Sequence, residues 1–130
     1  MEFNPLSKMA VVPLLKKSLG AYSARNNAIA ENIANVETKG YRPYKVDFEK
    51  ELQRAMYRSA PVGLKSDSRH MTIGGDVLDI QPKISTQNEI VNMEQEMAEL
   101  AKNQIRFEFA TRKLSGAYEL IRSAIRGHSR

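Results

Sequence analysis

Among its 130 residues the chain has no cysteine and no tryptophan, so it contains neither disulfide bonds nor thiolate metal ligands. No long apolar run lies between Met1 and Lys16. We therefore expect neither a Sec-type signal peptide nor a membrane helix in this stretch, and export would need another route. The length predicts a single domain spanning 1–130.

Residues suited to catalysis or metal binding are few and scattered. His70 lies in a predicted loop and His128 in the terminal tail. Asp67, His70, Asp76 and Asp79 have no spacing typical of a metal site, so we interpret them as solvated loop side chains. The sequence has no phosphate-binding glycine loop. We therefore predict a protein that is not an enzyme and has no cofactor, no metal and no small-molecule substrate.

The strongest positive signal is a run of apolar residues in 88–126, spaced alternately by three and four positions. A period of about 3.5 residues predicts a long helix that supercoils with a partner helix. Gln104 and Thr111 fill the two gaps in the series. The predicted inter-helix residues of this segment are Met97, Leu100, Phe107, Leu114, Tyr118, Ile121 and Ile125.

A second segment, 13–36, repeats this spacing near the N-terminus, and Pro13 suits a first helical turn. Its predicted inter-helix residues are Leu15, Leu19, Tyr22, Ile29 and Ile33. Matching patterns at both ends of the chain predict an antiparallel coiled-coil hairpin with the termini together. Two ordinary amphipathic helices of a compact bundle are the alternative. With flush termini, Leu19 would face Ile121 and Asn26 would face Leu114.

The middle of the chain has weaker patterns. A short helix is predicted over 47–58, with Asp47 as its N-cap. Glycine and proline interrupt 59–87, which we interpret as an extended, poorly regular arm in which Gly74-Gly75-Asp76 is able to turn a small hairpin. The predicted fold class is therefore all-α, with two long paired helices, one short helix and an arm.

The net charge is +5, and the basic residues concentrate towards the two ends of the chain. In a hairpin these basic residues lie at one end of the molecule. The alternatives for what they contact there are nucleic acid, an acidic protein surface and water. Phe109 follows Phe107 by two positions, about 200° round a helix, so it points away from the predicted seam. The candidate contacts to other subunits are Ile105, Phe109, Arg112, Arg122 and Arg126.

Two stretches of sequence carry a resemblance to a known family. Residues 28–41 resemble the N-terminal signature of bacterial flagellar rod and hook proteins, A-x-N-I-A-N-x-x-T-x-G-Y. The matching residues are Ala30, Asn32, Ile33, Ala34, Asn35, Thr38, Gly40 and Tyr41. A second match covers 93–107 and 120–125. In so short a chain, the two together resemble the small proximal rod proteins of the flagellar basal body, although Arg42-Pro43 stands where the family usually has Lys.

The resemblance implies a structural subunit of the basal-body rod, the periplasmic shaft that transmits torque from the MS ring to the hook. It also implies export by the flagellar type III apparatus without a cleaved signal peptide. The implied partners are the chain itself, other rod proteins, the rod–MS-ring junction protein, the MS ring and the export gate. A basic coiled-coil protein that binds nucleic acid is the alternative, although aromatic residues do not alternate with its basic residues.

Overall fold

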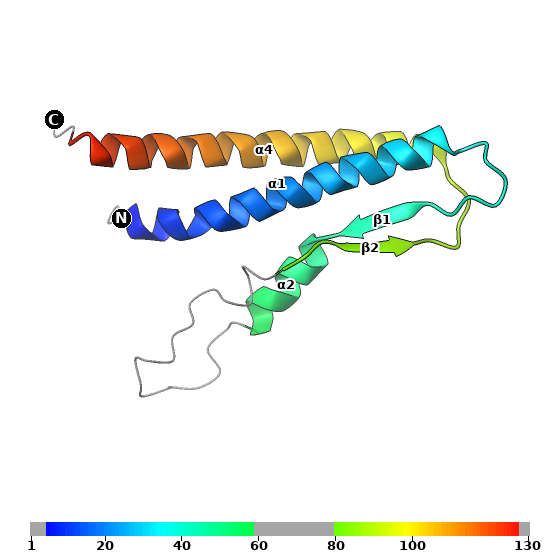
Figure 1. The fold of residues 1–130 in the computed structure, drawn as a ribbon, viewed down its shortest axis with the longest axis horizontal. Helices are drawn as coiled ribbons and strands as arrows, with labels where there is room; N and C mark the ends of the chain where they lie inside the picture. The colour runs from blue at the N-terminus through cyan, green and yellow to red at the C-terminus, as the bar shows by residue number, and fades with distance from the viewer. Residues whose placement is uncertain (1–4, 59–79, 128–130) are drawn as a thin grey trace.

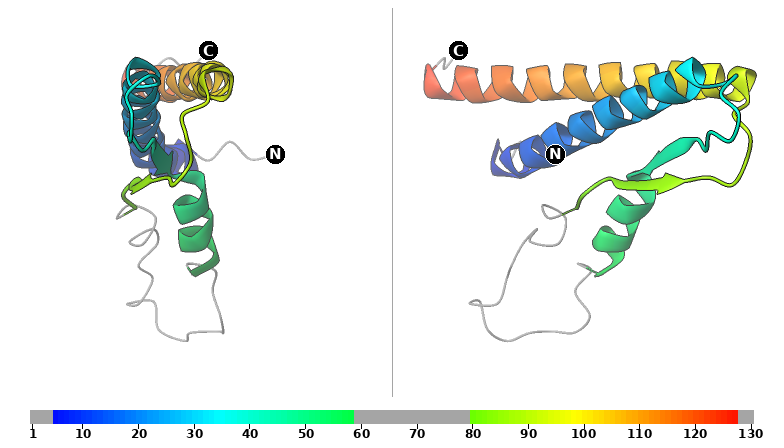
Figure 2. Two further views of the ribbon diagram at one scale, coloured as in Figure 1. Left: turned by 90° about the vertical axis from the view of Figure 1, so that its right-hand side faces the viewer. Right: turned by 45° about the vertical axis from the view of Figure 1, so that its right-hand side comes forward.

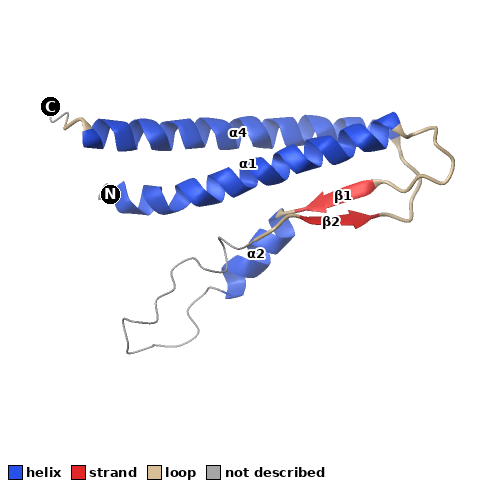
Figure 3. Cartoon of the chain, viewed as in Figure 1, coloured by secondary structure: helices blue, strands red, loops and turns tan. Residues whose placement is uncertain are grey.

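The computed structural model describes residues 5–58 and 80–127. Within these residues, five elements follow one another (Figures 1 and 3). They are α1 (Pro5–Ala34), β1 (Tyr44–Asp47), α2 (Glu49–Arg58), β2 (Lys83–Thr86) and α4 (Met93–Ile125). Helix α1 begins eight residues before the predicted start, because Pro13 lies inside the helix instead of opening it. Its last helical residue, Ala34, comes two residues before the predicted end.

The two long helices pack against each other as an antiparallel hairpin, which confirms the predicted fold class. Both termini lie at one end of the molecule, and the helices are closest at the opposite end, where α1 ends and α4 begins (Figures 1 and 2). Helix α4 begins at Met93, five residues later than predicted, and Asn92 is its N-cap. In the described part of the chain, no helix combines the length and the apolar character that a membrane span requires.

The side of α4 that faces α1, here called the inner face, repeats at alternating spacings of four and three. All of its residues are buried or half-buried: Glu96, Leu100, Asn103, Phe107, Ala110, Leu114, Ala117 and Ile121. Of the predicted seam, the heptad series from Leu100 to Ile121 lies on the inner face. The other predicted series does not, since its members Met97 and Ile125 are 56% and 80% exposed. A series from Glu96 to Ala117, with smaller and more polar residues, lies on the inner face in its place.

Asn103 shows why the polar line lies inside. Its side chain is fully buried, and its Nδ2 donates hydrogen bonds of 2.7 Å to the Tyr22 carbonyl and to Asn26 Oδ1. These bonds also correct the predicted register. Asn26 meets Asn103 instead of Leu114, a shift of 11 residues (114 − 103), or roughly 16 Å along the helix.

The middle of the chain contains a small sheet that the sequence analysis did not predict. Strands β1 and β2 pair antiparallel, with Tyr44 opposite Thr86 and Val46 opposite Ile84. The predicted N-cap residue Asp47 ends β1, and α2 begins at Glu49, with Leu52 N–H donating to the Phe48 carbonyl. Of the predicted arm, 59–79 lies outside the described residues, including the Gly74-Gly75-Asp76 turn and the four polar residues weighed as metal ligands.

The described residues 44–58 and 80–86, called the arm from here on, pack on the side of α1 that does not face α4. Phe48 is 1% exposed and packs with Ala21, Ile80 and Leu52. The Tyr22 ring meets it edge-on at 6.3 Å between centroids. Helix α1 is thus covered on two sides, by α4 and by the sheet with α2 (Figure 2).

The two phenylalanines of α4 separate the hairpin contact from the outer surface. Phe107→Ala removes a half-buried ring from the inner face and should lower the free energy of unfolding by about 1–2 kcal/mol. Phe109→Ala removes a ring that is 61% exposed and should change it by less than about 0.5 kcal/mol. Urea unfolding followed by circular dichroism measures both values, and equal destabilisation would contradict the assignment of the two faces.

Candidate functional site: a docked arm and an open helix face

The turn after α1 is built from residues of the signature. The Asn35 backbone carbonyl accepts from Thr38 N–H at 2.9 Å, and the Thr38 carbonyl accepts from Tyr41 N–H at 3.1 Å. Gly40 has a φ of 80°, a left-handed conformation that side chains with a Cβ rarely adopt. Asn35 Nδ2 donates back to the Glu31 carbonyl, which accepts near the end of the helix. These residues reverse the chain so that β1 runs back along α1.

Asn32 holds β1 against α1. Its side chain is 1% exposed. Its Oδ1 accepts from Tyr44 N–H at 2.8 Å, and its Nδ2 donates to the Tyr44 carbonyl at 2.9 Å. One amide therefore satisfies both backbone groups of a strand residue, as a neighbouring strand would. Tyr41 Oη donates to the same Oδ1 at 3.1 Å.

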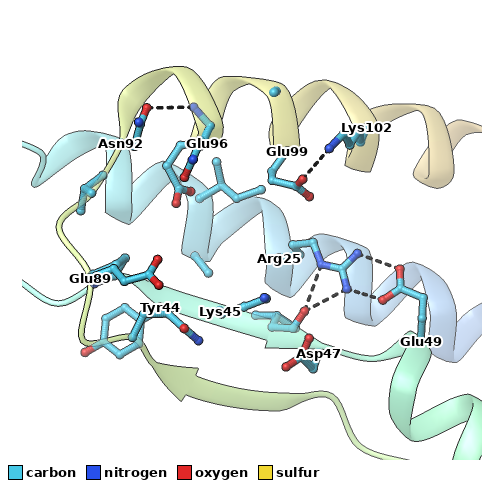
Figure 4. A pocket seen from close by; sticks show the side chains of 18 of the residues that line it. Arg25, Tyr44, Lys45, Asp47, Glu49, Glu89, Asn92, Glu96, Glu99 and Lys102 are labelled. Atoms are coloured by element: carbon cyan, nitrogen blue, oxygen red, sulfur yellow. Dashed lines mark hydrogen bonds and ion pairs between the residues drawn. The ribbon is translucent and has the colours of Figure 1, made fainter.

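Arg25 lies two helical turns before Asn32 and binds β1 at Val46, two residues after Tyr44. Its Nε and Nη2 donate to the Val46 carbonyl at 3.1 and 2.9 Å. The same guanidinium forms a two-pronged ion pair with Glu49, the first residue of α2 (Figure 4). Arg106 of α4 approaches Glu49 to 3.4 Å, so this carboxylate touches cations from both long helices.

This network shifts the ionisation of its members. Hydrogen bonds from Arg25 lower the pKa of Glu49 from its ordinary value of 4.5 to about 2, against the opposing effect of burial. The hydrogen bond to Glu49 likewise raises the pKa of Arg25. Glu49 is therefore ionised at neutral pH and stays so well into the acid range.

A cleft of about 640 Å³ lies between α1, β1 and the first half of α4 (Figure 4). Many of its charged groups already have partners in this chain, because Glu49 binds Arg25 and Glu99 binds Lys102 at 2.7 Å. Its apolar lining includes the buried Ile29, Val46 and Val91. The ion pairs of Arg25 and Arg106 with Glu49 join α2 to both long helices.

A side of α4 next to the inner face has no partner within the described chain. Its residues alternate at three and four positions, and every one is exposed: Glu94, Met97, Ala101, Gln104, Glu108, Thr111, Ser115, Tyr118, Arg122 and Ile125. We call this side the open face. It contains the line that the sequence analysis assigned to the hairpin seam. Lys16 of α1 reaches its edge, with Nζ 5.7 Å from the centroid of the Tyr118 ring.

The remaining site residues from the sequence analysis lie as follows. Ile105 and Phe109 are 70% and 61% exposed on a third side of α4, with Lys113 Nζ 5.3 Å from the Phe109 centroid. Arg112 lies 3.8 Å from Glu108. Of the predicted α1 seam, Ile29 is buried, while Leu15, Leu19, Tyr22 and Ile33 are half-buried. Arg122 and Arg126 are exposed, as are the signature residues Ala30 and Ala34.

Three residues of these contacts, Arg25, Glu49 and Asn103, were not among the residues predicted from the sequence. Arg25 and Glu49 pair across 24 positions, and nothing in either local sequence announces the pair. Asn103 did carry a signal, since it lies three positions after Leu100 and seven before Ala110 in a helical pattern. A pattern scored by apolarity alone passes over such a polar residue.

Comparison with known proteins gives a consistent picture, although no family model matches the chain. It is 25% identical over 119 residues to the flagellar basal body rod protein FlgB of Bacillus subtilis, covering 87% of this chain and 91% of that protein. It is 27% identical to FlgB of Escherichia coli, covering 82% and 86%. To FlgB of Cereibacter sphaeroides it is 30% identical over 109 residues, covering 79% and 84%.

The long hairpin, the signature turn and these similarities define a structural protein of the bacterial flagellum. The chain belongs to the FlgB family of flagellar basal body rod proteins. It is accordingly a component of the basal body and associates with other rod components.

Asn32 offers a direct test of the strand clamp. Asn32→Asp replaces the donor Nδ2 with a carboxylate oxygen that faces the Tyr44 carbonyl, so it should lower the free energy of unfolding by about 2–4 kcal/mol. The Tyr44 amide should also lose protection from hydrogen exchange. Asn27→Asp, on the exposed side of the same helix, is the matched control and should change little. An intact, protected β1 in Asn32→Asp would contradict the clamp.

The Arg25–Glu49 pair predicts an acid transition of the arm. Because the pKa of Glu49 is lowered on folding, its stabilisation is complete above pH 4.5 and is lost as the pH falls towards about 2. NMR signals of Val46 and Phe48 followed through this range should show the arm detaching from α1. Glu49→Gln should show a weaker arm at neutral pH and a smaller change between pH 4.5 and 2. An identical titration of both proteins would refute the role of Glu49.

Proposed function

We propose that the chain is a subunit of the proximal rod and assembles helically with other rod proteins into the shaft that transmits torque between the MS ring and the hook. The observation that carries this proposal is the open face of α4, which presents a helix-pairing repeat and leaves it exposed. Contact with a neighbouring subunit would cover the exposed Met97, Tyr118 and Ile125 of this face.

The inner geometry suits a part that resists twisting. The hairpin is fixed in register by the buried Asn103, and the arm is fixed to α1 by Asn32 and Arg25. These contacts are directional hydrogen bonds, so sliding or rotating one element against another breaks them. Torque applied to such a subunit passes to its neighbours instead of deforming it.

The outer geometry supplies contacts of two kinds. Ile105 and Phe109 give an apolar contact on one side of α4, while Arg112, Arg122 and Arg126 give charged contacts towards its C-terminal end. The proposed partners are further copies of the chain, the other rod proteins, the rod–MS-ring junction protein, the MS ring and the export gate. The proposed location is the periplasmic rod, reached through the flagellar type III apparatus without a cleaved signal peptide.

Deletion of the gene from its bacterium tests the proposal. The deletion strain should be non-motile and lack rods and hooks, while secretion through other systems continues. The wild-type gene supplied in trans should restore motility, and Phe109→Ala should restore it only in part, because the isolated subunit is stable but assembles weakly.

Two outcomes would contradict the proposal. One is a deletion strain with normal flagella. The other is tight DNA binding by the purified chain that weakens steeply with rising salt, as genuine phosphate contacts require. That second result would favour the nucleic-acid alternative.

A further inference from the structure

We propose that the outer edge of β2 receives an extended segment of a different rod protein, which joins the small sheet as a third strand. Such a contact belongs to the rod assembly proposed above, on which this proposal rests, and it leaves α4 free for other contacts. Strand β1 lies between α1 and β2, so β2 is the outer strand of the sheet (Figure 1). The side of Lys83–Thr86 that faces away from β1 is called the free edge.

The alternation of hydrogen bonds in the sheet determines which backbone groups reach the free edge. In an antiparallel pair, successive residues of a strand direct their N–H and carbonyl alternately towards and away from the partner strand. Pro43 and Gln87 are a bonded pair, because the Gln87 N–H donates to the Pro43 carbonyl at 2.8 Å. In the observed register, the odd-numbered residues of β2 therefore face β1. The backbone groups of Ile84 and Thr86 consequently point to the free edge.

The other edge of the sheet shows the same alternation. There, side chains of α1 bond the N–H and carbonyl of Tyr44 and the carbonyl of Val46. Tyr44 and Val46 lie opposite Thr86 and Ile84 in the register, so the two edges of the sheet present equivalent backbone groups. No described residue bonds those of Ile84 and Thr86. One edge is thus covered by side chains of α1, while the described residues leave the free edge open.

The side chains at the free edge are exposed as well. Ile84 is 61% exposed, and Lys83 and Thr86 are also exposed. Many natural edge strands are protected from an added strand by proline within the strand. Here Pro82 comes just before β2 and the strand itself has none, so Pro82 ends the free edge without blocking it. Ile84 and Thr86 together offer two N–H groups and two carbonyls to a third strand.

Charge indicates the chemistry of the added strand. Lys45 and Lys83 are exposed, and opposite or alternate residues of an antiparallel sheet share one face, so both lysines lie on the same face. Asp47 is the one acidic residue of the two strands on that face. An acidic residue beside Lys83 is therefore favourable, while an apolar residue beside Ile84 suits the opposite face. The fitting segment is extended and places an acidic residue next to an apolar one.

A second copy of this chain fits the free edge less well than a different rod protein. In a second copy, β1 is already bonded on both edges, by β2 and by side chains of α1. Strand β2 of that copy would bring Lys83 instead of an acidic residue. In strand addition, backbone bonds supply affinity and alternate side chains supply specificity. A third strand would thus join another rod protein in a defined register to an arm that α1 already holds.

Proline substitution separates the free edge from the sheet itself. Ile84→Pro removes an N–H that points away from β1, so the bonds between β1 and β2 remain. In the gene-deletion strain, Ile84→Pro should restore little or no motility. Ile84→Val keeps the N–H and the apolar contact and should restore it fully. Protection of the Tyr44 amide from hydrogen exchange in purified Ile84→Pro checks that β1 stays docked, and full motility of this variant would overturn the proposal.

Photo-crosslinking in basal bodies isolated from the bacterium gives a second readout that does not depend on proline. Benzoylphenylalanine replaces Ile84 in one strain and Thr86 in another, and mass spectrometry identifies the crosslinked residues. Along an added strand, the contacted residue should shift by two positions between the two probes. Along a helix it would shift by about four, because the probes lie roughly 6.6 Å apart and a helix rises about 1.5 Å per residue.

Both probes should reach one short segment of a different rod protein with the two-residue shift. The same probe at Gln53, which is exposed on α2, is the control and should not reach that segment. A shift of about four, crosslinks confined to peptides of this chain, or no crosslink from Ile84 or Thr86 would each overturn the proposal. Normal flagella in the deletion strain would instead refute the rod function itself, so the two failures are distinguishable.

Discussion

The packing of the small sheet on α1 depends on one side chain, that of Asn32. Its amide bonds the backbone N–H and carbonyl of Tyr44, as a neighbouring strand would. A two-stranded sheet has little stability of its own in water, and β1 has only four residues. By accepting from the Tyr44 N–H and donating to its carbonyl, Asn32 ties this sheet to a long helix. Arg25 extends the same tie to Val46 and then to α2 through Glu49. Without the amide, the arm keeps its hydrophobic contact at Phe48 and the bonds from Arg25, but the N–H and carbonyl of Tyr44 lose their partner on α1.

A single buried amide also fixes the pairing of the long helices. The contact between α1 and α4 uses small and polar residues, above all Asn103 and Ala110, which are 0% and 3% exposed. Small residues let the helices approach closely, and the buried amide fixes their register, since a shift by one turn would leave it without its partners. Larger apolar residues such as Met97 and Phe109 consequently remain outside. The exposed Met97 and Phe109 are therefore available for contacts with other subunits.

Local pattern was enough to predict the two long helices, their antiparallel pairing and the outward position of Phe109. The apolar pattern did not predict which residues of α4 face α1. Met97 lies three positions before Leu100 and Asn103 three positions after it, so each completes a series with helix-pairing spacing. Apolarity favours Met97, while the structure buries Asn103 because its amide finds Tyr22 and Asn26 across the interface. Such a partner is known only once the register is known.

The strands were missed for a related reason. Tyr44–Asp47 is short and carries two exposed residues, so its own sequence does not mark it as a strand. The groups that stabilise it lie on α1, 12 to 21 positions earlier. The signature did indicate that Asn32 matters, through resemblance, but not that its amide pairs with a strand. A residue whose role is to satisfy distant backbone groups gives no local signal.

The most direct test of this account is a through-hydrogen-bond NMR coupling between the Asn32 side-chain nitrogen and the Tyr44 carbonyl carbon. The account predicts a detectable coupling, together with side-chain amide protons of Asn32 that exchange slowly with water, because the group is buried and bonded on both sides. Absence of the coupling, with Asn32 amide protons that exchange as fast as those of exposed Asn27, would contradict the central claim that this amide docks the arm.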